Sequence, residues 1–289
     1  MKVRRIEKVL LYDEGVGGGL EIGEIAAYLK EKVSKVAVET RGEVFTLSPE
    51  KRVDFARKLA SIKIQDIGRK MVSEQEPLYA EVEYEKRRIL GMTSAFGVLY
   101  DGFRLQKVFS QLLAAEECNL RFVHILFTNR LFATWDEGNK RYHARTSLYG
   151  LPSLISTTGL VEAPAKPREY YLLKQQYDRL GRNLLEVKDK FKGTFIDYED
   201  ERLTAVVKGY AMQAVFYCLT GEPFCEDRGC RLYNAHWQEE LIFAQLKSKY
   251  EFCERHDRIL GSLRAEDVSG EKASYEGSQK HLEAEKTAH

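Results

Sequence analysis

Residues 6–40, "IEKVLLYDEGVGGGLEIGEIAAYLKEKVSKVAVET", decide the expected fold. The apolar run of "IEKVLLYDEG" predicts a strand, the spacing of apolar residues in "EIGEIAAYLKEKVSK" predicts a helix, and "VAVET" predicts a second strand. A strand, a helix and a strand in succession form a βαβ unit, and its two strands run parallel in one sheet. We therefore expect an α/β fold with a mostly parallel sheet.

The glycine-rich turn "GVGGGL" at residues 15–20 lies between the first strand and the helix, where a phosphate group could bind. However, Leu20 stands at the third glycine of G-x-G-x-x-G, and no Lys-Ser/Thr pair ends the turn as in a P-loop. A flexible turn is the favoured interpretation, and nucleotide binding is the alternative.

The next segments continue the alternation of helices and strands. "SPEKRVDFARKLASIKI" predicts a helix with Ser48 as N-cap and Pro49 in its first turn, and "DGFRLQKVFSQLLAAEE" predicts another. "RFVHILFTN" predicts a strand that is buried on both faces, because it is almost continuously apolar. "LFATWDEGNKRYHAR" predicts a hairpin or loop, and "SLISTTGLVEAP" predicts a further strand at an edge of the sheet.

Helices dominate the second half of the chain. "REYYLLKQQYDRLGRNLLEVKDKF" predicts one long helix, residues 202–219 predict a helix that is apolar nearly all round and therefore buried, and another helix is expected from about residue 235. We expect a single α/β domain over residues 1–260. The polar residues 261–289 predict a disordered tail.

Composition sets limits on the partners. The 45 basic and 44 acidic side chains give a net charge of +1, so no global field attracts nucleic acid or an anionic membrane. No stretch approaches the length of a membrane span and no secretory leader is evident, so a cytoplasmic protein is expected. In that reducing compartment, five cysteines are better interpreted as metal ligands or free thiols than as disulfides.

Four residues form two closely spaced pairs of metal-ligand type. Cys225 and Cys230 are spaced C-x4-C, and Cys253 and His256 are spaced C-x2-H. Two such pairs separated by a longer segment are typical of a tetrahedral zinc site, so residues 218–257 predict one structural zinc ion per chain. Gly229 is expected to give the first turn its backbone freedom. The alternative is that these thiols are ordinary core residues.

Other residues of metal-ligand type have simpler interpretations. Cys218, at the end of the buried helix, is expected to be a core thiol, Cys118 a structural residue on a helix, and His124 a satisfied buried histidine. His143 is expected on a polar loop. His236 and Glu239 in "HWQEEL" partly match the inverted motif H-x-x-E-H, but Glu240 replaces the second histidine; helix capping after Asn234 explains the same residues.

The order of these motifs resembles the archaemetzincins, zinc metalloproteases that carry H-E-x-x-H-x-x-G-x-x-H, then C-x4-C-x-M, then C-x-x-C. In "AVFYCLTGEPFCEDRGCRL" and "CERH", Gly221 matches the glycine, Cys225 and Cys230 the first thiol pair, Leu232 the methionine, and Cys253 and His256 the last pair. "LISTTGLVEAPAKPREYY" and "CRLYNAHWQEELI" also resemble an archaeal family of uncharacterised proteins described as metallopeptidases.

The resemblance implies a metzincin-type twisted sheet with long helices and a C-terminal structural zinc site, and it suggests "ISTTGL" as an edge strand for a peptide. The catalytic half of the motif is missing, because Ala214, Val215, Cys218 and Phe224 stand where the family has histidines and glutamate. We therefore expect a zinc-binding protein with a non-catalytic binding or scaffold role and a peptide or protein as partner. The alternative is an active metallopeptidase whose catalytic metal is held by His143, Cys218, His236 and Glu239.

Overall fold

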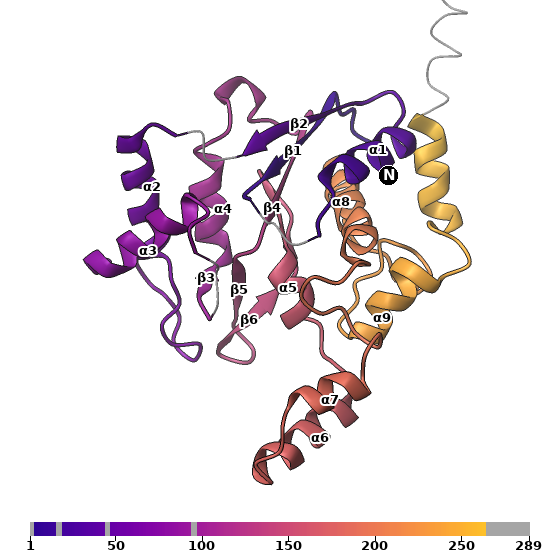
Figure 1. The fold of residues 1–289 in the computed structure, drawn as a ribbon. Helices are drawn as coiled ribbons and strands as arrows, with labels where there is room; N and C mark the ends of the chain where they lie inside the picture. The colour runs from indigo at the N-terminus through magenta and orange to yellow at the C-terminus, as the bar shows by residue number, and fades with distance from the viewer. Residues whose placement is uncertain (1–2, 16–18, 44–46, 94–96, 264–289) are drawn as a thin grey trace, which may run out of the picture.

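The computed structural model of the protein describes residues 3–15, 19–43, 47–93 and 97–263 and shows two mixed sheets surrounded by helices (Figure 1). The larger sheet has the strand order β2 (Ala37–Glu43), β1 (Lys8–Asp13), β4 (Phe122–Thr128), β8 (Ser153–Ser156) and β7 (Ser147–Leu148). All neighbouring pairs are parallel except β7 and β8. Helix α1 (Ile22–Lys32) joins β1 to β2, which confirms the predicted βαβ unit and the α/β fold.

Strand β4 lies at the centre of this sheet and is covered on both faces. Its residues Val123, Ile125 and Phe127 belong to one apolar core with α1 and α8 (Leu203–Thr220), whereas Leu126 belongs to a second core. That second core includes side chains from α2 (Pro49–Ser61) and α4 (Gly102–Ser110). Because alternate residues of a strand point to opposite faces, the continuous apolar run follows from this double burial, as predicted.

Helix α8 is buried over most of its 18 residues, which confirms the expected buried helix. It ends at Gly221, whose φ of +84° lies in the left-handed region and whose N–H donates to the Tyr217 carbonyl at 2.9 Å. Glycine adopts this conformation at little cost, so it stops the helix and turns the chain toward Cys225. At the start of α8, Thr204 Oγ1 accepts from the Glu21 N–H and donates to the Gly19 carbonyl. Residues 16–18 of the glycine-rich turn lie outside the described residues.

The second sheet, with the order β3 (Leu99–Asp101), β5 (Leu131–Asp136) and β6 (Arg141–Arg145), was not predicted. Strands β5 and β6 form the expected hairpin, and the three-residue β3 adds to it in parallel. Helix α3 (Tyr79–Ile89) was also missed, because Leu78 gives no N-cap signal. The expected helix over "DGFRLQKVFSQLLAAEE" is shorter, ending at Ser110, and is followed by the 3-10 turn η1 (Ala115–Glu117).

The prediction that "SLISTTGLVEAP" forms an edge strand is wrong. Only Ser153–Ser156 is a strand, and this strand, β8, lies between β4 and β7 inside the sheet. Residues Thr157–Glu162 form helix α5, because the Ser156 hydroxyl accepts from the Gly159 N–H at 2.8 Å and caps the helix. At this end of the sheet the edge strand is β7.

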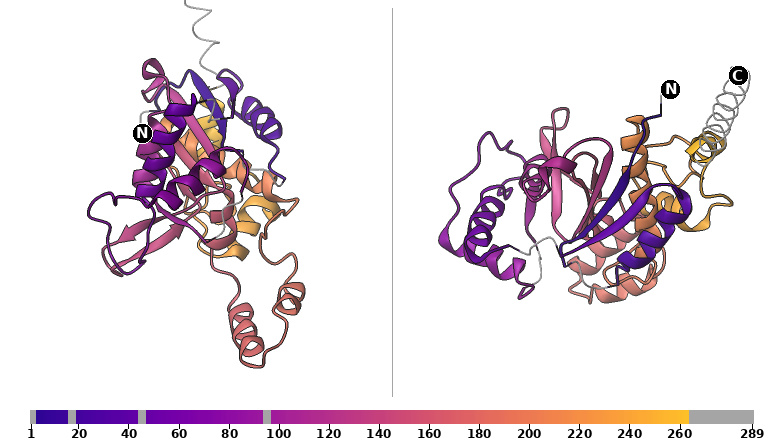
Figure 2. Two further views of the ribbon diagram at one scale, coloured as in Figure 1. Left: turned by 60° about the vertical axis from the view of Figure 1, so that its left-hand side comes forward. Right: turned by 90° about the horizontal axis from the view of Figure 1, so that it is seen from above.

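The single long helix expected from residue 168 is in fact two helices. α6 (Arg168–Arg179) and α7 (Leu185–Lys190) form a hairpin whose turn contains Gly181 in the left-handed region, at a φ of +62°. Tyr170 and Tyr177 of α6 form a small core with Val187 of α7 and Phe195. The hairpin projects from the rest of the protein (Figures 1 and 2).

The helix expected from about residue 235 begins at Gln238, and the last helix of the described chain was not predicted. α9 (Gln238–Ile242) continues into the π-helix η2 (Phe243–Lys247), and a last helix covers residues 254–263. Trp237, not Asn234, is the N-cap of α9, and the Glu240 carboxylate accepts from the N–H groups of His236 and Trp237. Residues 261–263 belong to the last helix, so the expected tail does not begin at 261; residues 264–289 lie outside the described residues.

Candidate metal centre

The first pair of candidate ligands lies on the loop that follows α8. The Cys225 N–H donates to the Leu232 carbonyl at 2.9 Å, and the Cys230 N–H donates to the Asp227 carbonyl at 3.0 Å. These two bonds fold residues 225–232 into a compact loop. The loop brings both thiols to one side, as the spacing predicts.

A small set of contacts around Asp227 fixes this loop. The Asp227 N–H donates to Cys225 Sγ at 3.4 Å, and its carboxylate accepts from the Gly229 N–H at 2.9 Å and from the Tyr250 hydroxyl at 2.8 Å. A Cβ atom at residue 229 would lie only 2.5 Å from that hydroxyl. Gly229 is therefore required for the close approach of Tyr250; its φ is not positive, so the predicted need for backbone freedom is not the reason.

The second pair lies at the start of the last helix. Cys253 comes just before residue 254, and the His256 N–H donates to the Cys253 carbonyl at 3.0 Å in the first turn. The His256 ring packs edge-on against Phe216 of α8, with ring centroids 5.0 Å apart. The site thus joins the end of α8 to the final helix.

The four ligand atoms lie together. Cys225 Sγ is 3.9 Å from Cys253 Sγ, and His256 Nδ1 is 3.6 Å from Cys230 Sγ and 3.1 Å from Cys253 Sγ. All four atoms are within 4.8 Å of one another. A tetrahedral zinc ion holds neighbouring sulfur and nitrogen ligands roughly 3.5 to 3.8 Å apart, so this donor set can hold such an ion. With three thiolates and one imidazole the coordination shell would be closed.

Burial controls the protonation of these groups. It raises the pKa of the Cys230 thiol to about 12 and also raises the pKa of the Cys225 thiol. Burial, with the nearby Arg255 guanidinium, lowers the pKa of His256, so its imidazole is neutral at pH 7. Without a metal ion both of these thiols are therefore protonated, and a bound cation would have to displace their protons.

The other predicted cysteines and His124 do not join the cluster. Cys218 is a buried core thiol as expected, and burial raises its pKa to about 11. His124 is buried with both ring nitrogens within hydrogen-bond distance of a partner, the Tyr12 hydroxyl at 3.0 Å and the Glu117 carbonyl at 3.1 Å, which confirms the prediction. Cys118 is exposed at the end of η1 and is not on an α-helix, contrary to the prediction.

The residues considered for a second metal site are dispersed. His143 lies on strand β6, not on a loop, with Nε2 3.7 Å from an Asp136 oxygen. His236 and Glu239 are exposed near the start of α9. Within residues 3–15, 19–43, 47–93 and 97–263, the cluster of Cys225, Cys230, Cys253 and His256 is the only group of three or more histidine, cysteine and acidic residues placed to share an ion.

The positions that match the catalytic motif are apolar. Ala214 and Val215 of α8 are fully buried in the main core, and Phe224 is partly exposed after the helix. Phe224 instead lines a cleft of about 420 Å³ between β7 and the loop after α8. Other lining residues include Arg145, Tyr149, Tyr217 and His236.

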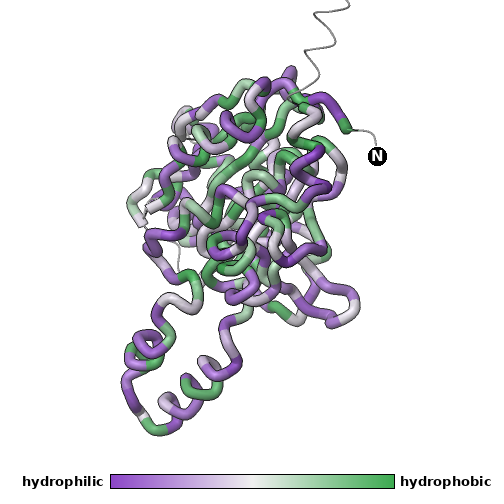
Figure 3. The backbone as a smooth tube through the Cα atoms, turned by 90° about the vertical axis from the view of Figure 1, so that its right-hand side faces the viewer, coloured by the Kyte–Doolittle hydropathy of each residue, from purple (hydrophilic) through white to green (hydrophobic). Residues whose placement is uncertain are grey.

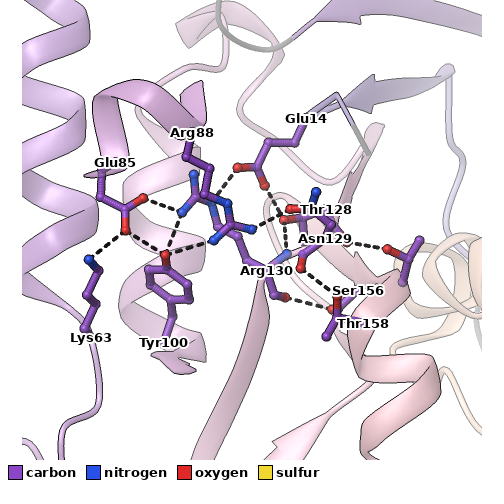
Figure 4. A network of polar contacts seen from close by, with 11 residues as sticks. Glu14, Lys63, Glu85, Arg88, Tyr100, Thr128, Asn129, Arg130, Ser156 and Thr158 are labelled. Carbon is purple, nitrogen blue, oxygen red and sulfur yellow. Dashed lines mark hydrogen bonds and ion pairs between the residues drawn. The ribbon is translucent and has the colours of Figure 1, made fainter. Parts of the chain in front are cut away.

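A buried ionic network, which the sequence did not predict, lies at the carboxyl ends of β1 and β4 (Figure 4). Arg130, which is completely buried, is paired with Glu14 after β1 and with Glu85 of α3. The Tyr100 hydroxyl donates to Glu85 at 2.7 Å and accepts from Arg130 at 2.9 Å. Because Arg130 lies between β4 and β5, the network ties the two sheets together. No spacing in the chain indicates that residues so far apart in sequence meet.

Comparison with known proteins identifies the family. A family model described as "Probable metallopeptidase family (DUF6775)" matches residues 5–263. The chain belongs to this probable metallopeptidase family. No curated protein and no solved structure matches it. Of the helices in the described parts of the chain, none is long and apolar enough to cross a membrane.

Proposed function

We propose that this member of the probable metallopeptidase family is a pseudoenzyme, a zinc-stabilised protein that binds peptides without cleaving them. The observation that carries the proposal is the composition of its one candidate metal cluster among the described residues, Cys225, Cys230, Cys253 and His256. Three thiolates and an imidazole leave no coordination position for water or substrate. Such a zinc ion stabilises the fold and does not activate a nucleophile.

The position of the lost catalytic site supports the same proposal. A zinc peptidase of this kind needs an open zinc ion and a carboxylate that takes a proton from its water. Here Ala214 and Val215 of α8 are packed into the core and are shielded from the cleft. The spacing of Gly221 and the thiol pairs supports descent from an archaemetzincin-like, metzincin-type ancestor.

The cleft beside β7 supplies a surface for a peptide. The Ser156 N–H donates to the Thr146 carbonyl at 2.8 Å, so Thr146 and Leu148 direct their backbone groups toward β8. Because successive residues of an antiparallel strand alternate, the backbone N–H and C=O groups of Ser147 and Tyr149 then point away from β8. They lie along the edge that borders the cleft. An extended peptide can pair with such an edge and place side chains against Tyr217 and Phe224.

The competing proposal is an active peptidase with a rebuilt catalytic metal site. The family description favours it. However, Cys218 is buried in the core, and neither His143 nor His236 joins a cluster of three metal-ligand residues among those described. The geometry therefore favours the non-catalytic proposal.

Metal content and casein cleavage separate the two proposals. We expect one zinc ion per purified chain and no cleavage of casein, an unfolded protein, with or without added zinc. Two zinc ions per chain, or cleavage that a chelator abolishes while the circular dichroism spectrum is unchanged, would establish the peptidase. A stable protein that contains no metal would contradict both proposals.

Peptide binding at β7 has its own test. Ser147→Pro removes the outward N–H without removing a β7–β8 hydrogen bond, so it should weaken the binding of fluorescent casein peptides about tenfold. Ser147→Ala is the matched control and should bind like the native protein. Equal binding by all three proteins would show that peptides do not pair with this edge.

A further inference from the structure

The hairpin of α6 and α7, with its flanking residues 166–192, is called the arm here. It projects well beyond the two sheets in Figure 1, in the left view of Figure 2 and in Figure 3. Its inner side is already used, because Tyr170, Leu173 and Tyr177 of α6 pack with Val187 and Phe191. The arm therefore has a small core of its own.

A second apolar stripe on α6 has no such use. Tyr171 and Leu172 are 48% and 67% exposed, and Leu184 after the turn is 37% exposed. These residues line a hollow of about 700 Å³ on the arm. On α6 its lining residues include Arg168, Tyr171, Leu172, Gln175 and Asp178, which follow helical spacing and so form one face. An exposed apolar face of this kind marks an interaction site.

The arm is strongly basic. Residues 166–192 contain eight basic and four acidic side chains, a net charge of +4, although the whole chain carries only +1. Lys174 and Arg179 of α6, like Lys192, have no ion-pair partner among the residues that the structure describes. Lys174 and Arg168 border the hollow directly. The field at this surface therefore selects a negatively charged partner.

The distribution of apolar residues distinguishes between kinds of partner. Leu180 and Leu185 at the tip are 61% and 64% exposed, but the exposed apolar side chains continue along α6 to Leu172, about 12 Å before the tip at the 1.5 Å rise of a helix. A hairpin that inserted only its tip into a membrane would leave Tyr171 and Leu172 in water. Nucleic acid would need a continuous run of cations along the hollow, but its lining also contains Leu172, Leu184 and the acidic Asp178. The arm of a second copy would be repelled by the same positive charge.

We propose that the outer face of the arm binds an acidic amphipathic helix of another protein. Leucines of that helix would fill the hollow between Leu172 and Leu184, and its carboxylates would face Arg168 and Lys174. The partner helix would then pack against α6 and α7, with apolar side chains at helical spacing in contact. This inference is independent of the proposed peptide-binding cleft.

The test uses the full chain and a synthetic helical peptide with leucine at every third and fourth position and glutamate elsewhere. We expect the peptide to bind, and the paired substitution Tyr171→Ser with Leu172→Ser to weaken binding at least about tenfold. Leu120→Ser is the matched control, because Leu120 is exposed like Leu172 but lies outside the arm. Lys174→Glu should also weaken binding, and added salt should weaken it further.

Each competing partner has a defined outcome. A peptide with the same composition but scrambled leucine positions should bind at least about tenfold more weakly than the helical one. The proposal is overturned if the paired variant binds the peptide as the native chain does. It is equally overturned if phosphatidylserine vesicles or a DNA duplex bind through the arm while the peptide does not. It is also overturned if Leu172→Ser abolishes dimers of this chain but leaves peptide binding unchanged.

Discussion

Arg130 donates from Nη1 to a Glu85 carboxylate oxygen at 2.6 Å, and neither side chain is exposed to solvent. Glu14 contacts the same guanidinium through Nε, and Lys63 approaches Glu85 to within 3.0 Å. A buried ion pair contributes little over a well-packed apolar pair, but the loss of one partner leaves a buried charge uncompensated. The network therefore makes the joint between the two sheets sensitive to single substitutions.

Arg130→Met should destabilise the protein by about 3–5 kcal/mol, because Glu14 and Glu85 would remain buried without their shared cation. Urea unfolding followed by circular dichroism measures the change. Arg57→Met is the control, because the Arg57–Glu76 pair is largely exposed and should matter little. A variant at residue 130 as stable as the native protein would show that the pairs do not hold the sheets together.

Acid should weaken the same contact between the two sheets. Burial alone would raise the pKa of Glu85, but Arg130 and Lys63 outweigh it and hold the pKa below the ordinary 4.5. A lowered carboxyl pKa contributes stability that is fully present above about pH 4.5 and is lost as the pH falls through the folded-state value. Glu85→Gln should reduce the acid dependence of the unfolding free energy. If the unfolding free energy of Glu85→Gln falls with pH as steeply as that of the native protein, the acid-sensitive group lies elsewhere.

Substitution of individual thiols should separate the metal cluster from the core. Cys225→Ser or Cys253→Ser should lose zinc and unfold, because a closed zinc site contributes directly to the free energy of folding. Cys218→Ser should keep its zinc, since Cys218 lies in the core outside the cluster. Atomic absorption of the purified variants gives the metal content. Loss of zinc from the Cys218 variant alone would mean that the ligand set is different.

Zinc affinity should rise with pH. The pKa of Cys230 is about 12 and that of Cys225 is also raised, so at pH 7 zinc must displace the protons of both thiols, whereas the neutral His256 gives up none. Affinity should therefore increase steeply between about pH 6 and pH 8. Calorimetric titration in buffers of different ionisation enthalpy counts the released protons. Release of no proton would contradict thiolate ligation.

Gly229→Ala should weaken zinc binding about tenfold or more, as changes in the surroundings of metal ligands commonly do. The added methyl group would lie 2.5 Å from the Tyr250 hydroxyl and displace it from Asp227, which holds the first thiol loop. Gly229→Ala combined with Tyr250→Ala removes the clash and should regain affinity lost to it. If the double variant binds zinc no better than Gly229→Ala alone, the clash is not the cause.

Local sequence patterns predicted the elements that depend on local signals. The βαβ unit, the Ser48-capped helix, the doubly buried strand β4 and the buried helix α8 were all evident from periodicity and capping. The grouping of two thiol pairs also followed from short spacings, because each pair lies within one loop or helical turn.

Features that depend on tertiary contacts could not be predicted in this way. The β-branched residues of "ISTTGL" suggested a strand, but Ser156 caps a helix and the Thr157 and Thr158 hydroxyls bond to the carbonyls of residues 128 and 129. Likewise, Glu14, Glu85 and Arg130 lie on segments far apart in the sequence, so only the folded chain brings them together.

The packing of Ala214 and Val215 limits how this chain could change in evolution. Both side chains are completely enclosed by the main core, so histidine and glutamate at these positions would overfill it and bury an unpaired carboxylate. Each single step would lower stability before any catalytic benefit appeared. A metal-binding H-E-x-x-H motif on this helix would therefore require the surrounding core to be rebuilt first.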